Sequence, residues 1–366
     1  STMKVQYVCN ILEEFAPLAL QEAYDNAGLI VGEPFMEVTG ILITLDVTME
    51  VLEEAHRKEC NFILAHHPLI FNPLKRLIGQ NETERCVVFA LKNDLAVYAA
   101  HTNLDNLWNG VNHKIAEKLQ LVNTQVLKPL SHQLLKLITF VPHAYVDNVR
   151  KALFDAGAGN IGNYDSCSFN VEGKGTFKAD ENAHPFVGEH NEFHIEPETR
   201  IEVILPYYLK SSVLNALLQA HPYEEPAYDL IPLENDWHRT GAGLMGNLET
   251  PIDELTFLRN LKTVFSVPCI RHTPLLGKDI VKVAVCGGSG STFLRNAIQQ
   301  GADVFISADF KYHEFFNADG KILIADVGHY ESEQFTKDIF YEIISKKIPN
   351  FVVKISETYT NPINYL

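Results

Sequence analysis

The sequence is short of the features that mark secreted, disulfide-rich and membrane proteins. Its 366 residues include only 6 cysteines, which are scattered and form no C-x-x-C pair. No apolar run reaches the roughly 18 residues that a membrane-spanning helix needs, and no charged-then-apolar leader opens the chain. A chain of this size with isolated cysteines is typical of a cytosolic protein whose thiols stay reduced. We therefore expect a cytoplasmic location and no membrane partner.

Positive charge is also scarce. Lys and Arg number 30 against 46 Asp and Glu, which gives a formal net charge of −16. Such a field repels phosphate backbones, so broad binding to nucleic acids is not expected. What remains is an ordinary globular composition, with 46% hydrophobic and 21% charged residues. The length predicts two or three domains.

The first and last thirds of the chain alternate between short apolar runs and amphipathic helical patterns. Strands alternating with helices of this length indicate a mostly parallel α/β sheet. The expected strands are 40–47, 61–66, 95–101, 280–288, 302–308 and 320–328. The expected helices are 4–15, 48–59, 82–94, 109–120, 291–301 and 332–347.

The middle of the chain has a different order. Strands are expected at 134–142, 164–173, 200–206 and 227–233, with helices at 145–157 and 208–221. This βαβ–βαβ order is the ferredoxin-like split pattern, a complete unit with its own core. We therefore predict an inserted ferredoxin-like α+β domain at 129–238, bounded by Pro129 and the glycine-rich stretch 239–247. Residues 1–128 and 239–366 would form one discontinuous α/β domain around it.

Histidines occur where expected strands end. His66 and His67 close the strand 61–66 and precede Pro68. On a regular strand two neighbouring side chains point to opposite faces. Where a proline breaks the ladder, the backbone can turn and aim both imidazoles into one crevice. Open α/β sheets bind ligands at this end of their strands.

Two other strand ends repeat the pattern and add carboxylates. His101 is followed by Asp105, and His329 by Glu333. If residue 329 opens a helix, His329 and Glu333 share one helix face. Together with His66 these residues predict a metal site.

The number of candidate ligands exceeds the needs of one catalytic zinc, which usually takes three protein ligands and keeps an open position. The five candidates, with His101 in reserve, are His66, His67, Asp105, His329 and Glu333. Such a set fits two ions, because a carboxylate can bridge them and a shared water can be activated between them. Mixed imidazole and carboxylate ligands suit Zn, Mn, Fe, Co or Ni better than Ca or Mg. We expect two divalent ions per chain, with zinc as the first choice.

Other segments admit two interpretations each. The turn Gly287–Gly290 could hold a phosphate or simply join a strand to a helix. It lacks the Gly-Lys-Ser/Thr of a P-loop, and Phe293 stands where a dinucleotide fingerprint needs glycine. Asp309 and His313 could act beside the metals, or they could be a helix cap and an exposed histidine. His101 could be a ligand, an acid/base group or an orienter of Asp105.

The motifs together resemble the NIF-three-like family, whose members are often labelled GTP cyclohydrolase type-2 homologues. They occupy residues 24–32, 45–55, 65–71, 101–106, 221–233, 287–290, 308–314 and 326–333. The resemblance implies a dimetal centre at the positions of the five candidate ligands. It also implies a toroidal homohexamer with its sites facing an internal cavity. In long family members the insert is similar to the signalling protein PII and to copper-tolerance-type trimers.

Two functional hypotheses of different class follow. In the first, the chain is a metal-dependent hydrolase acting on a nucleotide or another phosphorylated small molecule, with His101 and His313 as catalytic candidates. In the second, it is a metal-binding regulatory or protein-interaction hexamer without catalysis. An open metal coordination would favour the first, and a site saturated by protein groups would favour the second.

Overall fold

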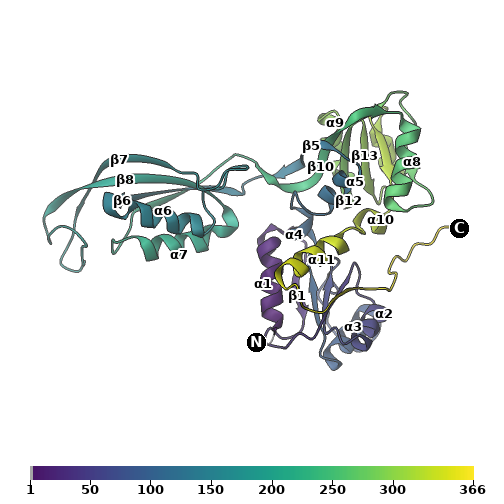
Figure 1. Ribbon diagram of the computed structural model, residues 1–366, viewed down its shortest axis with the longest axis horizontal. Coiled ribbons are helices and arrows are strands. Elements are labelled where there is room, and N and C mark those ends of the chain that lie inside the picture. Colours follow the sequence, from purple (N-terminus) through teal and green to yellow (C-terminus); the bar gives the residue numbers. More distant parts are fainter. Residues whose placement is uncertain (1–2) are drawn as a thin grey trace. The chain divides into compact units, whose positions relative to one another are not determined.

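The computed structural model describes residues 3–366, which divide into two compact units (Figure 1). One unit is Leu130–Trp237, and the other consists of the chain on either side of it. Both units mix helices with sheets, which confirms the expected α/β class. Each of the six cysteines is a free thiol. None of the helices within residues 3–366 has the length and apolar character to cross a bilayer.

The first sheet of the larger unit has five strands in the order β1-β4-β3-β2-β15. The strands β15, β2, β3 and β4 are parallel, and β1 pairs antiparallel with β4. Ala65 lies level with Thr44 on one side and Ala99 on the other, so three strands end at one edge. The bounds are β1 (Gly28–Val31), β2 (Ile41–Thr44), β3 (Phe62–Ala65), β4 (Ala96–Ala99) and β15 (Val353–Ile355).

Helices cover both faces of this sheet, which is why its central strands are buried throughout. Ile43 and Leu64 pack towards α1, while Leu42 and Ile63 pack towards α2 and α3, as the strand alternation requires. In Figure 1, α1 and the α2–α3 pair lie on opposite sides of the strands. The N-terminal helices are α1 (Val5–Phe15), η1 (Leu18–Leu20), α2 (Met49–Arg57), α3 (Glu82–Lys92), α4 (Thr102–Asp105) and α5 (Val111–Lys118).

The second sheet of this unit has six strands in the order β11-β14-β13-β12-β10-β5. Its centre is parallel, whereas β10 pairs antiparallel with β12, and β11 pairs antiparallel with β14. The strands are β5 (Val122–Leu130), β10 (Trp237–Ile252), β11 (Arg271–His272), β12 (Ile280–Ser289), β13 (Val304–Ala308) and β14 (Leu323–Asp326).

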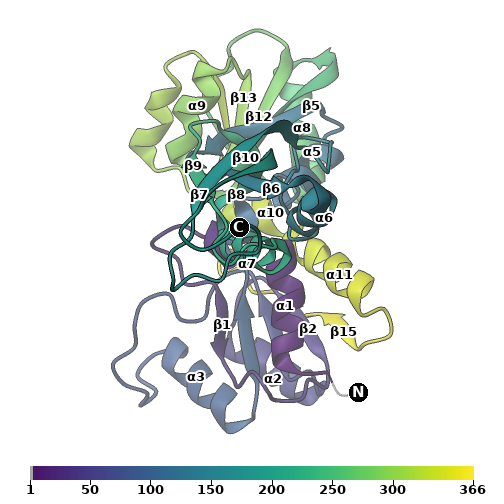
Figure 2. The same ribbon diagram turned by 90° about the vertical axis from the view of Figure 1, so that its left-hand side faces the viewer.

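The second sheet is also covered on both faces. Ala297 of α9 packs with Phe305 on one face, whereas Leu261 of α8 and Ile115 of α5 join Val304 on the other. Figure 2 shows α9 on one side of these strands and α5 and α8 on the other. The remaining helices are α8 (Glu254–Phe265), η4 (Ser291–Phe293), α9 (Leu294–Gln299), η5 (Tyr312–Ala318), α10 (His329–Glu333) and α11 (Thr336–Lys347).

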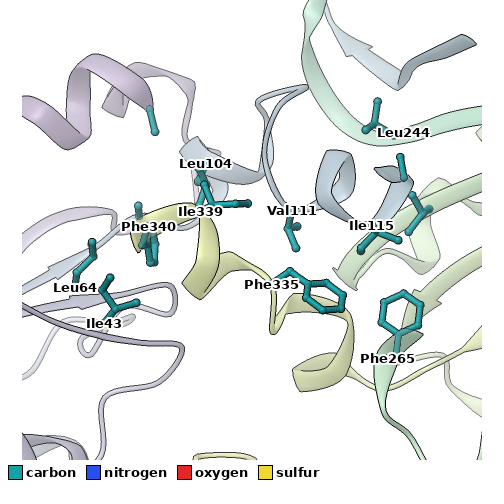
Figure 3. Close-up of a cluster of buried hydrophobic side chains, with 14 of the residues drawn as sticks. Ile43, Leu64, Leu104, Val111, Ile115, Leu244, Phe265, Phe335, Ile339 and Phe340 are labelled. Carbon is teal, nitrogen blue, oxygen red and sulfur yellow. The ribbon is translucent and has the colours of Figure 1, made fainter. Parts of the chain in front are cut away.

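One continuous apolar cluster joins the two sheets (Figure 3). Ile43 and Leu64 of the first sheet and Leu244 of the second belong to it. Phe335 and Phe340, which lie just before and within α11, are buried in the same cluster. This shared core fixes the ends of β3 and β4 relative to α10.

The smaller unit is an antiparallel sheet with two helices. Its strand order is β7-β8-β6-β9, with β6 and β8 in the middle. Val149 of α6 and Leu217 of α7 are fully buried against Leu137 and Leu205 in a core of their own. The elements are β6 (Leu134–Pro142), η2 (His143–Tyr145), α6 (Val146–Asp155), β7 (Phe169–Lys178), β8 (Phe193–Pro206), η3 (Tyr207–Leu209), α7 (Lys210–Ala220) and β9 (Tyr228–Pro232).

The glycine-rich stretch 239–247, which was expected to bound the insert, begins just after the smaller unit ends at Trp237 and forms the middle of β10. A Cβ on Gly241 would run into the carbonyl of Lys128 on the neighbouring β5. Glycine within a strand often marks such a close approach of another backbone. The stretch therefore serves strand pairing.

Candidate metal centre

The end of β3 turns as the proline predicted. The backbone N–H groups of His66 and His67 both donate to the carbonyl of Leu45, at 3.2 and 2.9 Å. Because two successive amides share one acceptor, strand alternation is lost at this point. The two imidazoles therefore lie on one side of the chain, with ring centroids 4.9 Å apart.

Helix α10 supplies a second pair of side chains. His329 and Glu333 stand one turn apart, and His329 Nε2 lies 3.0 Å from Glu333 Oε2. Glu333 is 2% exposed. The helical spacing expected from the sequence thus places both groups on the same face of the helix.

The carboxylate of Glu333 is shared by two groups of side chains. Its Oε2 lies 2.7 Å from His67 Nε2, and its Oε1 lies 3.5 Å from His66 Nε2. Asp105 Oδ1 is also 3.5 Å from His66 Nε2. Two sets of potential ligands result, and within each set the ligand atoms lie within 4.8 Å of one another. The first set is His67, His329 and Glu333, and the second is His66, Asp105 and Glu333.

His101 belongs to the same cluster. It stands at the start of α4, and its ring centroid is 5.2 Å from that of His66 and 5.5 Å from that of His67. These three histidines form a further potential ligand set. The Nδ1 of His101 lies 2.9 Å from Asp25 Oδ1, so Asp25 orients the ring.

The Nδ1 atom of every histidine in the cluster lies at hydrogen-bond distance from an acceptor oxygen. Donation of Nδ1–H to a carbonyl or carboxylate leaves Nε2 free to accept from the centre, which is the usual arrangement behind metal-binding histidines. We infer the tautomers from these acceptors. They are the Ala100 carbonyl for His66 at 2.8 Å, Asp46 for His67 at 2.7 Å, Asp25 for His101 at 2.9 Å and Asp309 for His329 at 2.7 Å.

His66 and Asp105 each turn inward an atom that lacks the hydrogen-bond partner that burial demands. Within the described chain, His66 Nε2 and Asp105 Oδ1 are buried and make no hydrogen bond. A buried polar atom left in this state costs about 1–3 kcal/mol. A cation between them would satisfy both, so the residues present fit a metal ion.

In the absence of an ion, protons take up the positive charge. Burial disfavours the charged ring of His67, but hydrogen bonds to Asp46 and Glu333 outweigh it and raise its pKa to about 10. Burial likewise opposes the charge on His329, yet contact with Glu333 raises its pKa to about 9. Burial works against the charge on Glu333, but the surrounding imidazoles hold its pKa well below the usual range. The centre therefore stabilises the Glu333 carboxylate as a buried anion beside positively charged groups.

The two residues of the 308–314 segment behave differently. Asp309 accepts from His329 Nδ1 and adopts a left-handed backbone with φ 58°. His313 is exposed on η5, where its ring contacts Tyr312 and Phe316. A catalytic role for His313 stays a prediction.

The glycine turn after β12 serves the carboxylate of α10. The amides of Gly287 and Gly288 already donate to Asn112 Oδ1 and Ser332 Oγ, each at 2.8 Å. Gly288 has φ +74°, and a Cβ there would collide with the carboxylate of Glu333. These contacts favour the tight-turn interpretation and give the turn a role in seating Glu333.

Comparisons with known proteins give matches over nearly the whole chain. Residues 3–362 match the family described as Duf34/NIF3 (NGG1p interacting factor 3). A protein of Halalkalibacterium halodurans called GTP cyclohydrolase 1 type 2 homolog is 38% identical over 99% of this chain and 98% of its own. A Bacillus subtilis protein of the same name is 37% identical over the same shares. The crystal structure of a Bacillus cereus protein related to NIF3 covers 100% of both chains with 37% identity and a TM-score of 0.88.

Proposed function

Because the chain belongs to the Duf34/NIF3 family, we propose that it binds two divalent metal ions and uses them in hydrolysis. The observation that carries the proposal is the shared position of Glu333. Its two oxygens face two different ligand sets, as a bridging carboxylate requires. His67 and His329 would hold one ion, and His66 and Asp105 the other.

Zinc is the ion that we propose first. Three imidazoles and two carboxylates suit zinc and the neighbouring transition metals, whereas calcium and magnesium prefer oxygen ligands alone. Each ion would take three side chains, which leaves coordination positions open for water and substrate. When bound, such a pair of ions supplies an activated water and polarises the substrate oxygen.

His101 is the group best placed to move a proton. Asp25 receives its Nδ1–H, which leaves Nε2 directed at the cluster that contains His66 and His67. A histidine oriented in this way is a typical general acid or base. We propose that the substrate is a nucleotide or another phosphorylated small molecule, in keeping with the name of the curated relatives. The amides of Gly287 and Gly288 already donate to other groups, so the proposed substrate does not depend on their binding its phosphate.

Elemental analysis of protein purified without added metal tests the ligand sets. We expect two ions per unsubstituted chain and also per His313→Ala chain, which is the matched control. Asp105→Ala should keep the ion of the other set, and Glu333→Ala should keep neither. His66→Ala with His67→Ala should lose most metal while circular dichroism stays native. Full metal content in the Glu333→Ala protein would reject a bridging role.

A screen of nucleotides and phosphoesters tests catalysis. With metal content unchanged, His101→Ala should lower turnover of any substrate found by about 10²–10⁴-fold, the usual contribution of acid–base catalysis. If every substrate stays intact in the presence of metal-loaded protein, hydrolysis is excluded for the classes tested.

The smaller unit supports the second candidate function, metal-linked regulation. Its strand order, β7-β8-β6-β9 around two helices, is the order of a ferredoxin-like domain, and we propose that it is a PII-like insert. It contains a cavity of about 810 Å³, whose lining includes Phe140, Phe177, Glu198 and Tyr223.

We also propose the homohexamer that the family resemblance implies. Light scattering tests the assembly, and ligand-induced thermal shifts test the cavity.

A further inference from the structure

The segment that follows β15, residues 356–366, is tied to the larger unit by a buried carboxylate. We call this segment the strap; it runs as an extended thread to the C-terminus (Figure 1). Glu54 of α2 is 1% exposed. It accepts hydrogen bonds from the Ser356 hydroxyl, the Glu357 amide at 2.9 Å and the Thr358 hydroxyl at 2.8 Å. The start of the strap is therefore fixed beside the first sheet.

Three successive residues of the strap then contact two parts of the metal centre in alternation. The ring of Tyr359 lies 5.0 Å from that of Tyr330 on α10. The hydroxyl of Thr360 donates to Asp46 Oδ2 at 2.7 Å. Asn361 Nδ2 donates to Glu331 Oε1 at 2.9 Å, again on α10.

Asp46 connects the strap to a candidate ligand. One of its oxygens accepts from Thr360 and the other accepts from His67 Nδ1, also at 2.7 Å. A carboxylate held at both oxygens cannot rotate about its terminal bond. Thr360 thus determines how Asp46 faces the imidazole, and through it the direction of His67 Nε2.

Helix α10 needs outside support because it is only five residues long. A helix this short is unstable by itself, since nucleation costs more than its few hydrogen bonds return. Glu331 lies between His329 and Glu333 in the sequence and is buried. Asn361 donates to its Oε1, and the hydroxyl of Tyr365 donates to its Oε2. The strap therefore anchors the helix that carries the shared carboxylate.

We propose that the strap is a positioning element of the metal centre, in which Thr360 aligns His67 through Asp46 while Tyr359 and Asn361 hold α10. The inference rests on the proposed metal binding. Residues outside the ligand sets would thus hold β3 and α10 in the correct relative position. The measurable consequences are the coordination geometry and the metal affinity of the site.

Titration of metal-free full-length protein with Co²⁺, followed by visible absorption, tests the proposal. Thr360→Val removes the hydroxyl and keeps the shape, and Thr360→Ser restores the hydroxyl. Thr358→Val is the matched control, because it loses a comparable hydrogen bond from the same strap but to Glu54. Loss of a direct partner of a metal-binding histidine costs about 10–100-fold in affinity. Thr360 is one step further away, so we expect roughly 3–10-fold weaker binding and a changed Co²⁺ spectrum in Thr360→Val alone.

The outcomes separate the two levels of inference. Native affinity and spectrum in Thr360→Val would overturn the positioning role while leaving the metal proposal intact. Equal changes in Thr360→Val and Thr358→Val would also overturn it, since the effect would then be general loosening. If the unsubstituted chain binds no Co²⁺, the metal proposal fails and this inference fails with it. Recovery of the native spectrum in Thr360→Ser is the expected result.

Discussion

Nε2 of His329 lies 3.2 Å from Nε2 of His67, across 262 residues of sequence. Two neutral imidazoles cannot present lone pairs to each other at this distance without repulsion. One ring must carry a proton there, or both must face a cation. Protons and metal ions therefore compete for the same nitrogens.

This competition predicts opposite pH dependences for the two forms of the protein. His67 and His329 have folded-state pKa values of about 10 and about 9, above the ordinary 6.5. Their contribution to metal-free stability is present in full below pH 6.5 and is lost as pH rises through 9 to 10. Metal binding displaces these protons, so metal affinity should instead rise over this range.

Thermal unfolding and zinc titration between pH 6.5 and 9 check the two signs. The melting temperature of the metal-free protein should fall with pH, and zinc titration should release protons and tighten with pH. A metal-free protein that becomes more stable between these values would contradict the assigned charges.

Glu333 and Glu331 offer a comparison on one short helix. Glu333→Gln should weaken metal binding by more than the roughly 10–100-fold expected for an outer partner, because it alters both ligand sets. Glu331→Gln changes a buried carboxylate that accepts from Asn361 and faces away from the ligands. It should lower stability more than metal affinity. Isothermal titration with zinc measures the difference, and equal affinities for the two variants would reject the helix geometry.

Gly288 is expected to be essential for the centre. Gly288→Ala would place a methyl group against the Glu333 carboxylate, so we expect loss of most bound metal. Gly301 has a similar backbone, φ +78°, but no described atom lies within 4 Å of the added Cβ. Gly301→Ala should therefore cost only the roughly 1–2 kcal/mol of left-handed strain. Metal analysis and denaturant unfolding of the two variants check this, and retention of metal by Gly288→Ala would contradict it.

Removal of the smaller unit should leave the metal centre intact. Leu130 ends β5 and Trp237 begins β10, and these strands are neighbours in one sheet. Neighbouring strands are about 5 Å apart, so a short Gly/Ser linker can replace residues 131–236. We expect a folded protein with native metal content by circular dichroism and elemental analysis. An unfolded or metal-free product would show that the smaller unit is integral to the larger one.

The positions of the candidate ligands could be predicted because they follow from local rules. Strand ends at His66 and His101 and a helical turn between His329 and Glu333 are visible in the sequence. The acceptors behind the histidines are not. Asp46 and Asp25 lie 21 and 76 residues from the rings that they orient, and no local pattern links them. A carboxylate near the end of an expected strand, as Asp46 is in 40–47, was an available signal.

The middle of β10 shows why other parts were missed. Residues 239–247 were not expected to form a strand, because glycine disfavours strands in general. Only the neighbouring backbone at Lys128 explains why Gly241 is needed there. Such close approaches depend on tertiary pairing, which a single sequence does not reveal.

The late position of Glu333 has a consequence for biosynthesis. His66, His67 and Asp105 leave the ribosome early, yet the carboxylate shared by both ligand sets comes more than two hundred residues later. A nascent chain can fold its N-terminal portion first, but that portion offers only an incomplete site. We therefore expect the two ligand sets that share Glu333 to be complete only after translation has passed α10.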